Sequence, residues 1–321
     1  MPEDLRCDVP HKKISIVEIP DANPEGAHVL STPELDDDTL PFLGPVTAGG
    51  TGMIGCHDIT ALEGRFQVAG ASCLEEGQIW DISDPANPTT KGGPHTHIRN
   101  PFITGPPGQL RGLFHTTSFT WDGKILFFTD EWQGGGAHGC DGPQDTRGNV
   151  WFYKNVAPGE TAPLYGRYMF PRAQPAAEAC TLHNGNAIPD PKGRYLGVSA
   201  AYEGGTSVFD FSRVTGFPEI SVDPTDDVPD TPGVPPVVAT EIAWADMQSG
   251  DGKGKDDVWS AYWYNDYIYT NGGLGRSGCC RGLDVFRLTD SDGKPFNAPD
   301  WLYSNPQTQE TWQGVGWGRN K

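Results

Sequence analysis

The sequence predicts an all-β protein, a β-propeller of four-stranded blades. Its 321 residues include 42 Gly and 29 Pro, which favours short strands joined by turns over long helices. An ordered triplet of apolar runs recurs along the chain, and in three copies a histidine opens it. Such repeats, with insertions between them, are typical of a propeller, in which each blade buries its faces against its neighbours. A β-sandwich is the competing interpretation.

The chain begins with a segment that lacks strand character, residues 1–12. Residues 13–20 form a β-run that ends at Pro20 and resembles the third strand of a repeat, and residues 27–31 could supply an outer strand. We therefore expect a propeller over residues 13–290, a C-terminal tail over 291–321, and about five blades of which the first is incomplete. Because a propeller ring must close, we expect a shortened form of a longer protein, or closure by another chain.

Four complete triplets follow the first segment. The second contains Asp122-Gly123, a strong hairpin signal, between two of its strands. Fourth strands are expected at residues 164–170 and 239–244. The expected triplets are 55–60, 66–70 and 78–83; then 113–119, 125–131 and 149–153; then 183–186, 194–198 and 206–211; and finally 258–264, 267–270 and 282–288.

The charge balance excludes one class of partner. A net charge of -19 and 23 Lys+Arg against 42 Asp+Glu argue against a face that binds nucleic acid. No apolar run approaches the ~20 residues of a transmembrane segment. The first residues also lack the apolar stretch of a signal peptide.

The seven cysteines contain no C-x-x-C pair, so a zinc ribbon is not expected. Cys56 and Cys73 flank a predicted hairpin, where neighbouring strands could bring them within disulfide reach. Two buried thiols are the alternative. A disulfide would indicate an oxidising compartment.

Histidines at equivalent repeat positions form the candidate site. The first strand of each blade lines the central channel, so His57, His115 and His183 are expected to converge at one end of the axis. Three imidazoles suit a transition metal such as Cu, Zn or Fe, and an open fourth position would admit water or substrate. Alternatively, these rings plug the channel and bond to the backbone.

Other polar residues could complete the site. Glu178, shortly before the third repeat, is a candidate further ligand, and Asp58 and Asn186 are candidate partners of the ligands or alternative ligands. A calcium site would instead gather the oxygens of Asn184, Asn186 and Glu178.

Three further sets of residues carry weaker signals. His95 and His97 lie on an expected connection between blades, where they could add ligands, cap the channel or sit on a surface loop. His138 is expected at the surface of a Gly-rich insertion. Asp130-Glu131, at the end of a strand, could be an acid/base pair, although acidic residues are common in turns.

Several motifs over roughly residues 12–290 resemble the LVIVD-repeat family. The resemblance implies a bacterial, secreted or surface-anchored β-propeller, and the family mostly lacks an assigned function. The chain departs from the family pattern because it has no signal peptide and no repeats before Lys13. The motifs are Gly55-Cys56-His57-Asp58-Ile59-Thr60, Gly77-Gln78-Ile79-Trp80-Asp81-Ile82-Ser83-Asp84-Pro85, His183-Asn184-Gly185-Asn186, Glu203-Gly204-Gly205-Thr206-Ser207-Val208-Phe209-Asp210-Phe211, Trp259-Ser260-Ala261-Tyr262-Trp263-Tyr264-Asn265 and Arg281-Gly282-Leu283-Asp284-Val285-Phe286.

Two main functions remain open at this stage, and calcium-assisted hydrolysis of a lactone or ester at Asn184, Asn186 and Glu178 is a third. The first is a secreted, metal-dependent enzyme that acts on a small molecule at the channel mouth. The second is an extracellular binding or scaffold module for a protein or glycan, with structural histidines. Both place the protein outside the cell, at the cell surface or in the periplasm. Because a propeller supports many functions, the fold does not choose between them.

Overall fold

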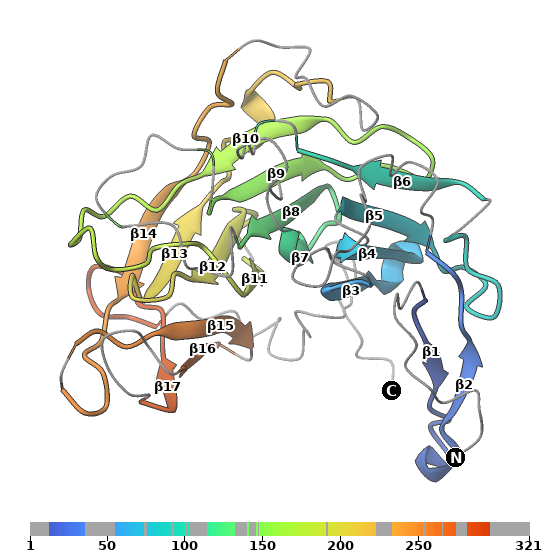
Figure 1. The fold of residues 1–321 in the computed structure, drawn as a ribbon, viewed down its shortest axis with the longest axis horizontal. Helices are drawn as coiled ribbons and strands as arrows, with labels where there is room; N and C mark the ends of the chain where they lie inside the picture. The colour runs from blue at the N-terminus through green and yellow to red at the C-terminus, as the bar shows by residue number, and fades with distance from the viewer. Residues whose placement is uncertain are drawn as a thin grey trace, which may run out of the picture.

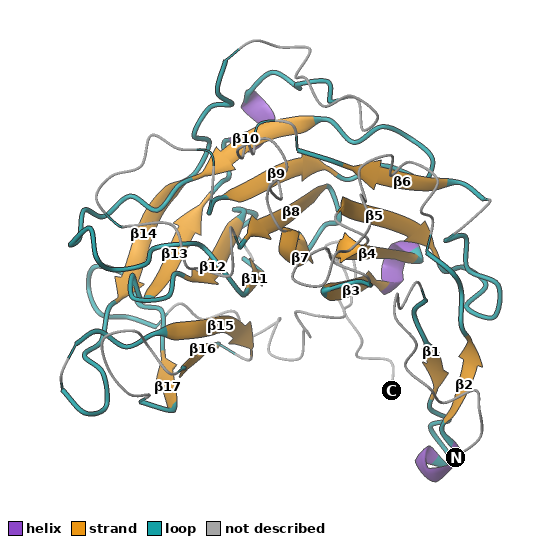
Figure 2. Cartoon of the chain, viewed as in Figure 1, coloured by secondary structure: helices purple, strands orange, loops and turns teal. Residues whose placement is uncertain are grey.

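The computed structural model of the chain describes residues 13–35, 55–73, 76–90, 93–100, 102, 114–131, 140, 146, 148–190, 192–222, 233–252, 254–264, 266–273 and 281–295. Strands dominate this part of the chain (Figure 2). Its helices are short 3-10 turns: η2 (Pro24–Gly26), η3 (Glu63–Arg65) and η5 (Val214–Gly216). Within the described ranges, no helix has the length and apolar character needed to cross a membrane.

The strands form the blades of a β-propeller, as predicted. Four antiparallel sheets follow one another around an arc in Figure 1, and each is a meander of consecutive strands. The first sheet comprises β3 (Asp58–Leu62), β4 (Gln67–Cys73), β5 (Glu76–Asp81) and β6 (His95–Ile98); the second β7 (Phe114–Phe119), β8 (Ile125–Asp130), β9 (Val150–Lys154) and β10 (Leu164–Tyr168); the third β11 (Gly185–Ile188), β12 (Leu196–Ala200), β13 (Thr206–Asp210) and β14 (Thr240–Ala245); and the fourth β15 (Val258–Tyr264), β16 (Tyr267–Gly272) and β17 (Leu283–Phe286).

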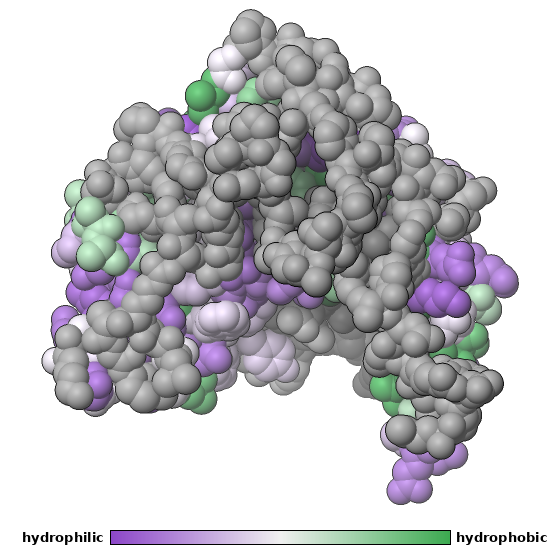
Figure 3. All heavy atoms as spheres, viewed as in Figure 1, coloured by the Kyte–Doolittle hydropathy of each residue, from purple (hydrophilic) through white to green (hydrophobic). Residues whose placement is uncertain are grey.

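The described strands form four blades and not the expected five, and the segment expected as an incomplete first blade is a separate two-stranded sheet. It pairs β1 (Ile16–Glu18) with β2 (His28–Ser31). Val17, Ile19 and Val29 are exposed here, and Figure 3 shows hydrophobic surface over this ribbon. Of the expected tails, 1–12 and 291–321, residues 1–12 and 296–321 lie outside the described residues. Residues 291–295 form a turn in which Asp290 N–H donates to the Lys294 carbonyl at 2.9 Å.

One strand was not expected. His95 and His97 belong to β6, the outermost strand of the first blade, and not to a connection between blades. The sequence gives little sign of this strand because three of its four residues are polar and Ile98 is its one aliphatic residue.

The core lies between the blades. Strand β8 illustrates why, since successive side chains of a strand point to opposite faces. Leu126 and Phe128 pack with the first blade, whereas Ile125 and Phe127 pack with the third. Strand β8 is therefore buried on both faces, as is β12 of the third blade, which explains their near-continuous apolar runs, whereas strands of the fourth blade such as β15 alternate between buried and exposed residues. Between the second and third blades, aromatic rings stack or meet at their edges; they are Phe127, Phe152, Phe209 and Phe211.

Polar side chains connect the inner strands β3, β7, β11 and β15, which lie nearest the centre of the arc (Figure 1). The Asp58 carboxylate accepts a hydrogen bond from the Thr117 backbone N–H at 3.1 Å. The Asn186 side chain accepts one from Trp263 N–H at 2.8 Å and donates one to Trp263 C=O at 3.0 Å. These bonds fix the relative height of neighbouring blades, and so of the histidines on them.

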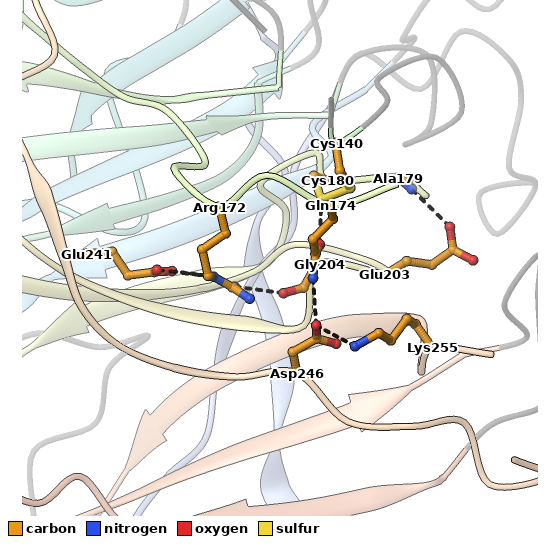
Figure 4. The surroundings of a disulfide bond; sticks show 10 residues. All are labelled: Cys140, Arg172, Gln174, Ala179, Cys180, Glu203, Gly204, Glu241, Asp246 and Lys255. Atoms are coloured by element: carbon orange, nitrogen blue, oxygen red, sulfur yellow. Dashed lines mark hydrogen bonds and ion pairs between the residues drawn. A yellow bond between two sulfur atoms is a disulfide. The ribbon is translucent and has the colours of Figure 1, made fainter. Parts of the chain in front are cut away.

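Two disulfides are present among the described cysteines. Cys56 and Cys73 are bonded, which confirms the predicted bridge beside His57. The second, Cys140–Cys180, spans 40 residues and was not predicted, because Cys140 lies in an insertion far from Cys180 in sequence. Figure 4 shows it beside Gln174, whose amide donates to the Asp246 carboxylate at 2.6 Å.

Candidate metal centre

Three histidine rings lie against one another at one end of the inner strands, tilted by 46° and 44° between neighbours. His57 directly precedes β3, His115 is the second residue of β7, and His183 lies two residues before β11. The ring centroids are 3.8 Å apart for His57 and His115, and 3.9 Å apart for His115 and His183. The equivalent positions of three successive repeats therefore come together in space.

Glu131, the residue after β8, adds a carboxylate to this group. Its Oε2 lies 3.3 Å from His115 Nε2, and its Oε1 lies 3.3 Å from His183 Nε2. The two Nε2 atoms are themselves 2.9 Å apart. His57, His115 and Glu131 each offer a ligand atom within 4.8 Å of the others, so they could hold a metal ion.

Carbonyl groups of the next blade fix the orientation of two rings. His57 Nδ1 donates to the His115 carbonyl at 3.1 Å, and His183 Nδ1 donates to the Trp259 carbonyl at 2.6 Å. A carbonyl oxygen can only accept, so each Nδ1 carries the hydrogen. In the neutral rings the lone pair is therefore on Nε2.

The third ring is fixed by a hydroxyl group. The Thr116 hydroxyl donates to Asn184 Oδ1 at 2.6 Å, so its oxygen is left to accept from His115 Nδ1 at 3.1 Å. His115 then has the same tautomer as the other two. Ligand histidines in metal sites are typically held in this way by a partner of the second nitrogen.

The distances around His115, His183 and Glu131 are compatible with a metal ion, whereas the ligand atom of His57 is placed only within 4.8 Å of those of His115 and Glu131. His115 Nε2 and His183 Nε2, two acceptor atoms, face each other at 2.9 Å, which is unfavourable unless a cation lies near both. Ligand atoms about 2.0–2.1 Å from one ion are separated by roughly 2.9 Å at a right angle and 3.4 Å at the tetrahedral angle. The measured 2.9 and 3.3 Å fall in this interval. Imidazole nitrogens with one carboxylate suit Zn, Cu or Fe.

The protonation states also fit. Burial lowers the pKa of His115 to about 2, with additional contributions from His183 and His57, so this ring stays neutral. Burial raises the pKa of the Glu131 carboxyl, but the neighbouring His183 and the hydrogen bond from Tyr202 outweigh it and hold the pKa below its ordinary value. Neutral imidazoles and an ionised carboxylate are the forms that bind metal.

Aromatic residues surround the buried side of the group. Tyr202 donates its hydroxyl hydrogen to Glu131 Oε1 and lies with its ring 4.7 Å from that of His183. Its φ of 47° is in the left-handed region, which is unusual for an aromatic residue and is often found at functional sites. His115, His183 and Glu131 are buried while His57 is exposed, so solvent reaches the group from the His57 side.

Glu178 does not join this group. Its backbone carbonyl accepts from the Cys140 N–H at 3.1 Å, and its carboxylate is not among the groups that could hold an ion with His57 and His115 in the described part of the chain. Burial raises the pKa of its carboxyl, and the nearby carboxyls of Asp246 and Glu203 raise it further. The carboxylate beside the histidines is that of Glu131, which the sequence indicated only as half of an acid/base pair with Asp130.

The remaining candidate ligands have other partners. Asp58 and Asn186 bond to the neighbouring blades, and Asn184 accepts from Thr116. The oxygens expected for calcium are thus engaged separately. His95 and His97 lie on β6, three strands outward from β3, and interact with each other. His138 lies outside the described residues.

Comparison of the sequence with family models and with curated proteins gives no match. Among solved structures, the chain is similar to two that are titled "COPII on membranes, outer coat vertex" and "The structure of the COPII coat assembled on membranes". Each is 9% identical with a TM-score of 0.41 and matches 88% of this chain. The chain covers 58% of the first and 32% of the second, so it spans only part of their length.

Proposed function

We propose that this protein is a metal-dependent β-propeller enzyme whose centre is formed by His57, His115, His183 and Glu131. The observation that carries the proposal is the approach of the Nε2 atoms of His115 and His183 to each other and to the Glu131 carboxylate, at 2.9–3.3 Å. A purely structural plug would pair each acceptor nitrogen with a donor. Here the acceptors face one another.

The accessible side of the group supports an enzyme over a closed structural site. His57 is exposed, so a substrate or water molecule could approach an ion held by the buried residues. A divalent ion at such a position supplies a Lewis acid and can activate water. The protein's own contribution is to fix the three ring orientations, keep Glu131 ionised and exclude water from the His183 side.

Metal binding is the direct test. Chelator-treated protein is titrated with Zn²⁺ and followed by calorimetry, in wild type and in a His183→Ala variant. We expect one site at the axial group in the wild type, and its loss in the variant. His28→Ala, which removes an exposed ring that pairs with Glu18 at 3.4 Å, serves as the matched control. A folded wild-type protein that binds no Zn²⁺, Cu²⁺ or Fe²⁺ at the axial group would contradict the proposal.

The alternative is an extracellular binding module for a protein or glycan, with structural histidines. It predicts that partner capture survives in His183→Ala. The proposed enzyme predicts instead that turnover of a small-molecule substrate is lost together with the metal.

We further propose a secreted or cell-surface location and membership of the LVIVD-repeat group. Both disulfides support an oxidising compartment. The quoted motifs fall alternately on the first and third strands of three blades, and this regular placement supports the family proposal. Expression with and without export to an oxidising compartment, with thiol counting, tests the location.

A further inference from the structure

A second pair of histidines lies on the outermost strand of the first blade. His95 and His97 alternate with Thr96 along β6, so their rings are on one face of the strand and Thr96 is on the other. The Thr96 hydroxyl donates to the Glu160 carbonyl at 2.8 Å, which fixes the strand on its opposite side. The two rings meet edge to face, with centroids 4.4 Å apart.

In both rings Nδ1 is the hydrogen-bond donor. His95 Nδ1 donates to the Gly93 carbonyl at 2.9 Å, and His97 Nδ1 donates to the Glu76 carboxylate. Both partners are pure acceptors, so in the neutral rings the lone pairs lie on the Nε2 atoms. These two atoms face each other at 2.6 Å. A cation between them would remove the repulsion of the two lone pairs.

Glu76 is built to orient His97. Its side chain is 1% exposed, and its carboxylate also accepts from Arg99 Nε at 3.2 Å and from Gln78 Nε2 at 2.9 Å. A buried carboxylate that bonds the second nitrogen of an imidazole is a common outer partner of a metal-bound histidine. Both rings are partly exposed, so solvent reaches them.

We propose that His95 and His97 form a second site for a divalent transition-metal ion, separate from the axial group. Imidazole pairs bind Zn, Cu or Ni, and Glu76 positions His97 for this role. An ion would move the Nε2 atoms apart from 2.6 Å to about 2.9–3.4 Å, which small rotations of the two rings provide. The competing occupant is a single shared proton.

The stoichiometry of Zn²⁺ binding to the full chain tests the second site. Chelator-treated wild type is expected to bind two ions, one per site. The double variant His95→Ala/His97→Ala is expected to keep the axial ion, and His183→Ala to keep the outer one. His28→Ala should bind as the wild type does. Circular dichroism checks that the double variant is folded. A folded double variant that binds as many ions as the wild type would overturn the proposal.

Crystals of wild-type protein soaked in Zn²⁺ provide a measurement that needs no variant. We expect an anomalous peak at the zinc edge that lies between the two Nε2 atoms. If the electron density shows both rings well ordered, with their Nε2 atoms still at hydrogen-bond distance and no anomalous peak between them, the rings share a proton. That result would overturn the proposal. Because the axial site gives its own peak, failure of either site is distinguished from failure of the other.

Discussion

His115 is the central residue of the candidate metal centre. Its ring lies between those of His57 and His183, and its Nε2 faces both the His183 ring and the Glu131 carboxylate. Burial keeps it neutral, with a pKa lowered to about 2, so protons compete weakly for its lone pair. The hydrogen bond that its Nδ1 donates to the Thr116 hydroxyl then determines that Nε2 faces the centre.

At this scale, Glu131→Gln should weaken metal binding while leaving the fold in place. The amide has the shape of the carboxylate but lacks its charge, so we expect the Kd for Zn²⁺ to rise at least about 10-fold. Competition with a chromophoric chelator measures this change. Glu219→Gln, which removes a surface carboxylate paired with Lys154 at 2.9 Å, is the control and should not alter the Kd. Equal affinity in Glu131→Gln and wild type would exclude Glu131 as a ligand.

The sequence located the histidines but not their carboxylate. His57, His115 and His183 occupy one position of a repeat, so periodicity alone predicts that they converge. Glu131 has no counterpart in the other repeats, and it reaches the group only because β8 pairs with β7 in a register that places Phe114 opposite Asp130. Such a register is not visible in the amino-acid sequence.

At the scale of single elements, the β7–β8 turn depends on Asp122. Its Oδ1 accepts from the Thr120 hydroxyl at 2.9 Å and from Lys124 N–H at 3.1 Å, and its Oδ2 accepts from the Tyr195 hydroxyl at 2.8 Å. Burial raises the pKa of this carboxyl, but bonds from Lys124 and Tyr195 outweigh it and lower the pKa overall. The ionised side chain thus joins the turn to the third blade.

Asp122→Asn should therefore destabilise the protein at neutral pH by about 1–3 kcal/mol. Because the folded pKa is below the unfolded value, the carboxylate's contribution is present above about pH 4 and is lost as the pH falls through the folded pKa. Urea unfolding of both proteins between pH 7 and pH 3 measures the difference. We expect the two curves of stability against pH to converge at the acidic end. A constant difference over the whole range would contradict this role.

The Cys140–Cys180 disulfide stabilises the segment that leads into His183. A bridge that closes 40 residues contributes about 4 kcal/mol through the entropy of the unfolded chain. Replacing both cysteines with serine should lower the free energy of unfolding by about this amount, measured by denaturant titration. The matched pair Cys56→Ser/Cys73→Ser, which opens a 17-residue separation, should cost about 3 kcal/mol. A larger loss from the shorter bridge would contradict the loop-length argument.

Element prediction succeeded where the strands are apolar on both faces. Strands such as β8 and β13 were expected because their apolar runs are bounded by turn residues. The strand β6 was missed because its sequence, His95-Thr96-His97-Ile98, is polar, and the outermost strand of a blade has only one strand neighbour. The pairing of Cys140 with Cys180 also depends on the packing of an insertion that has no periodic signal.

At the scale of the whole molecule, the candidate ion would join three blades. His57 precedes the first strand of one blade, His115 and Glu131 belong to the second, and His183 precedes the third. Repetition of a strand triplet was enough to predict this order of blades around an axis. The number of blades follows less directly, because β1 and β2 form a sheet of their own.

An ion that joins three blades should stabilise the entire fold. At a free concentration of 100 times its Kd, a ligand that binds only the folded state adds about 2.7 kcal/mol. We expect Zn²⁺ to raise the Tm of chelator-treated wild-type protein, followed by circular dichroism, and to have a much smaller effect on His183→Ala. Identical shifts in both proteins would indicate that the ion binds elsewhere.

The most direct test of the metal centre is the location of metal in crystals of the purified wild-type protein by anomalous scattering, together with elemental analysis of the same preparation. We predict near-stoichiometric metal and a peak about 2.0–2.2 Å from Nε2 of His115 and His183 and from a carboxylate oxygen of Glu131. A well-ordered axial group with no peak in metal-supplemented crystals would contradict the central claim.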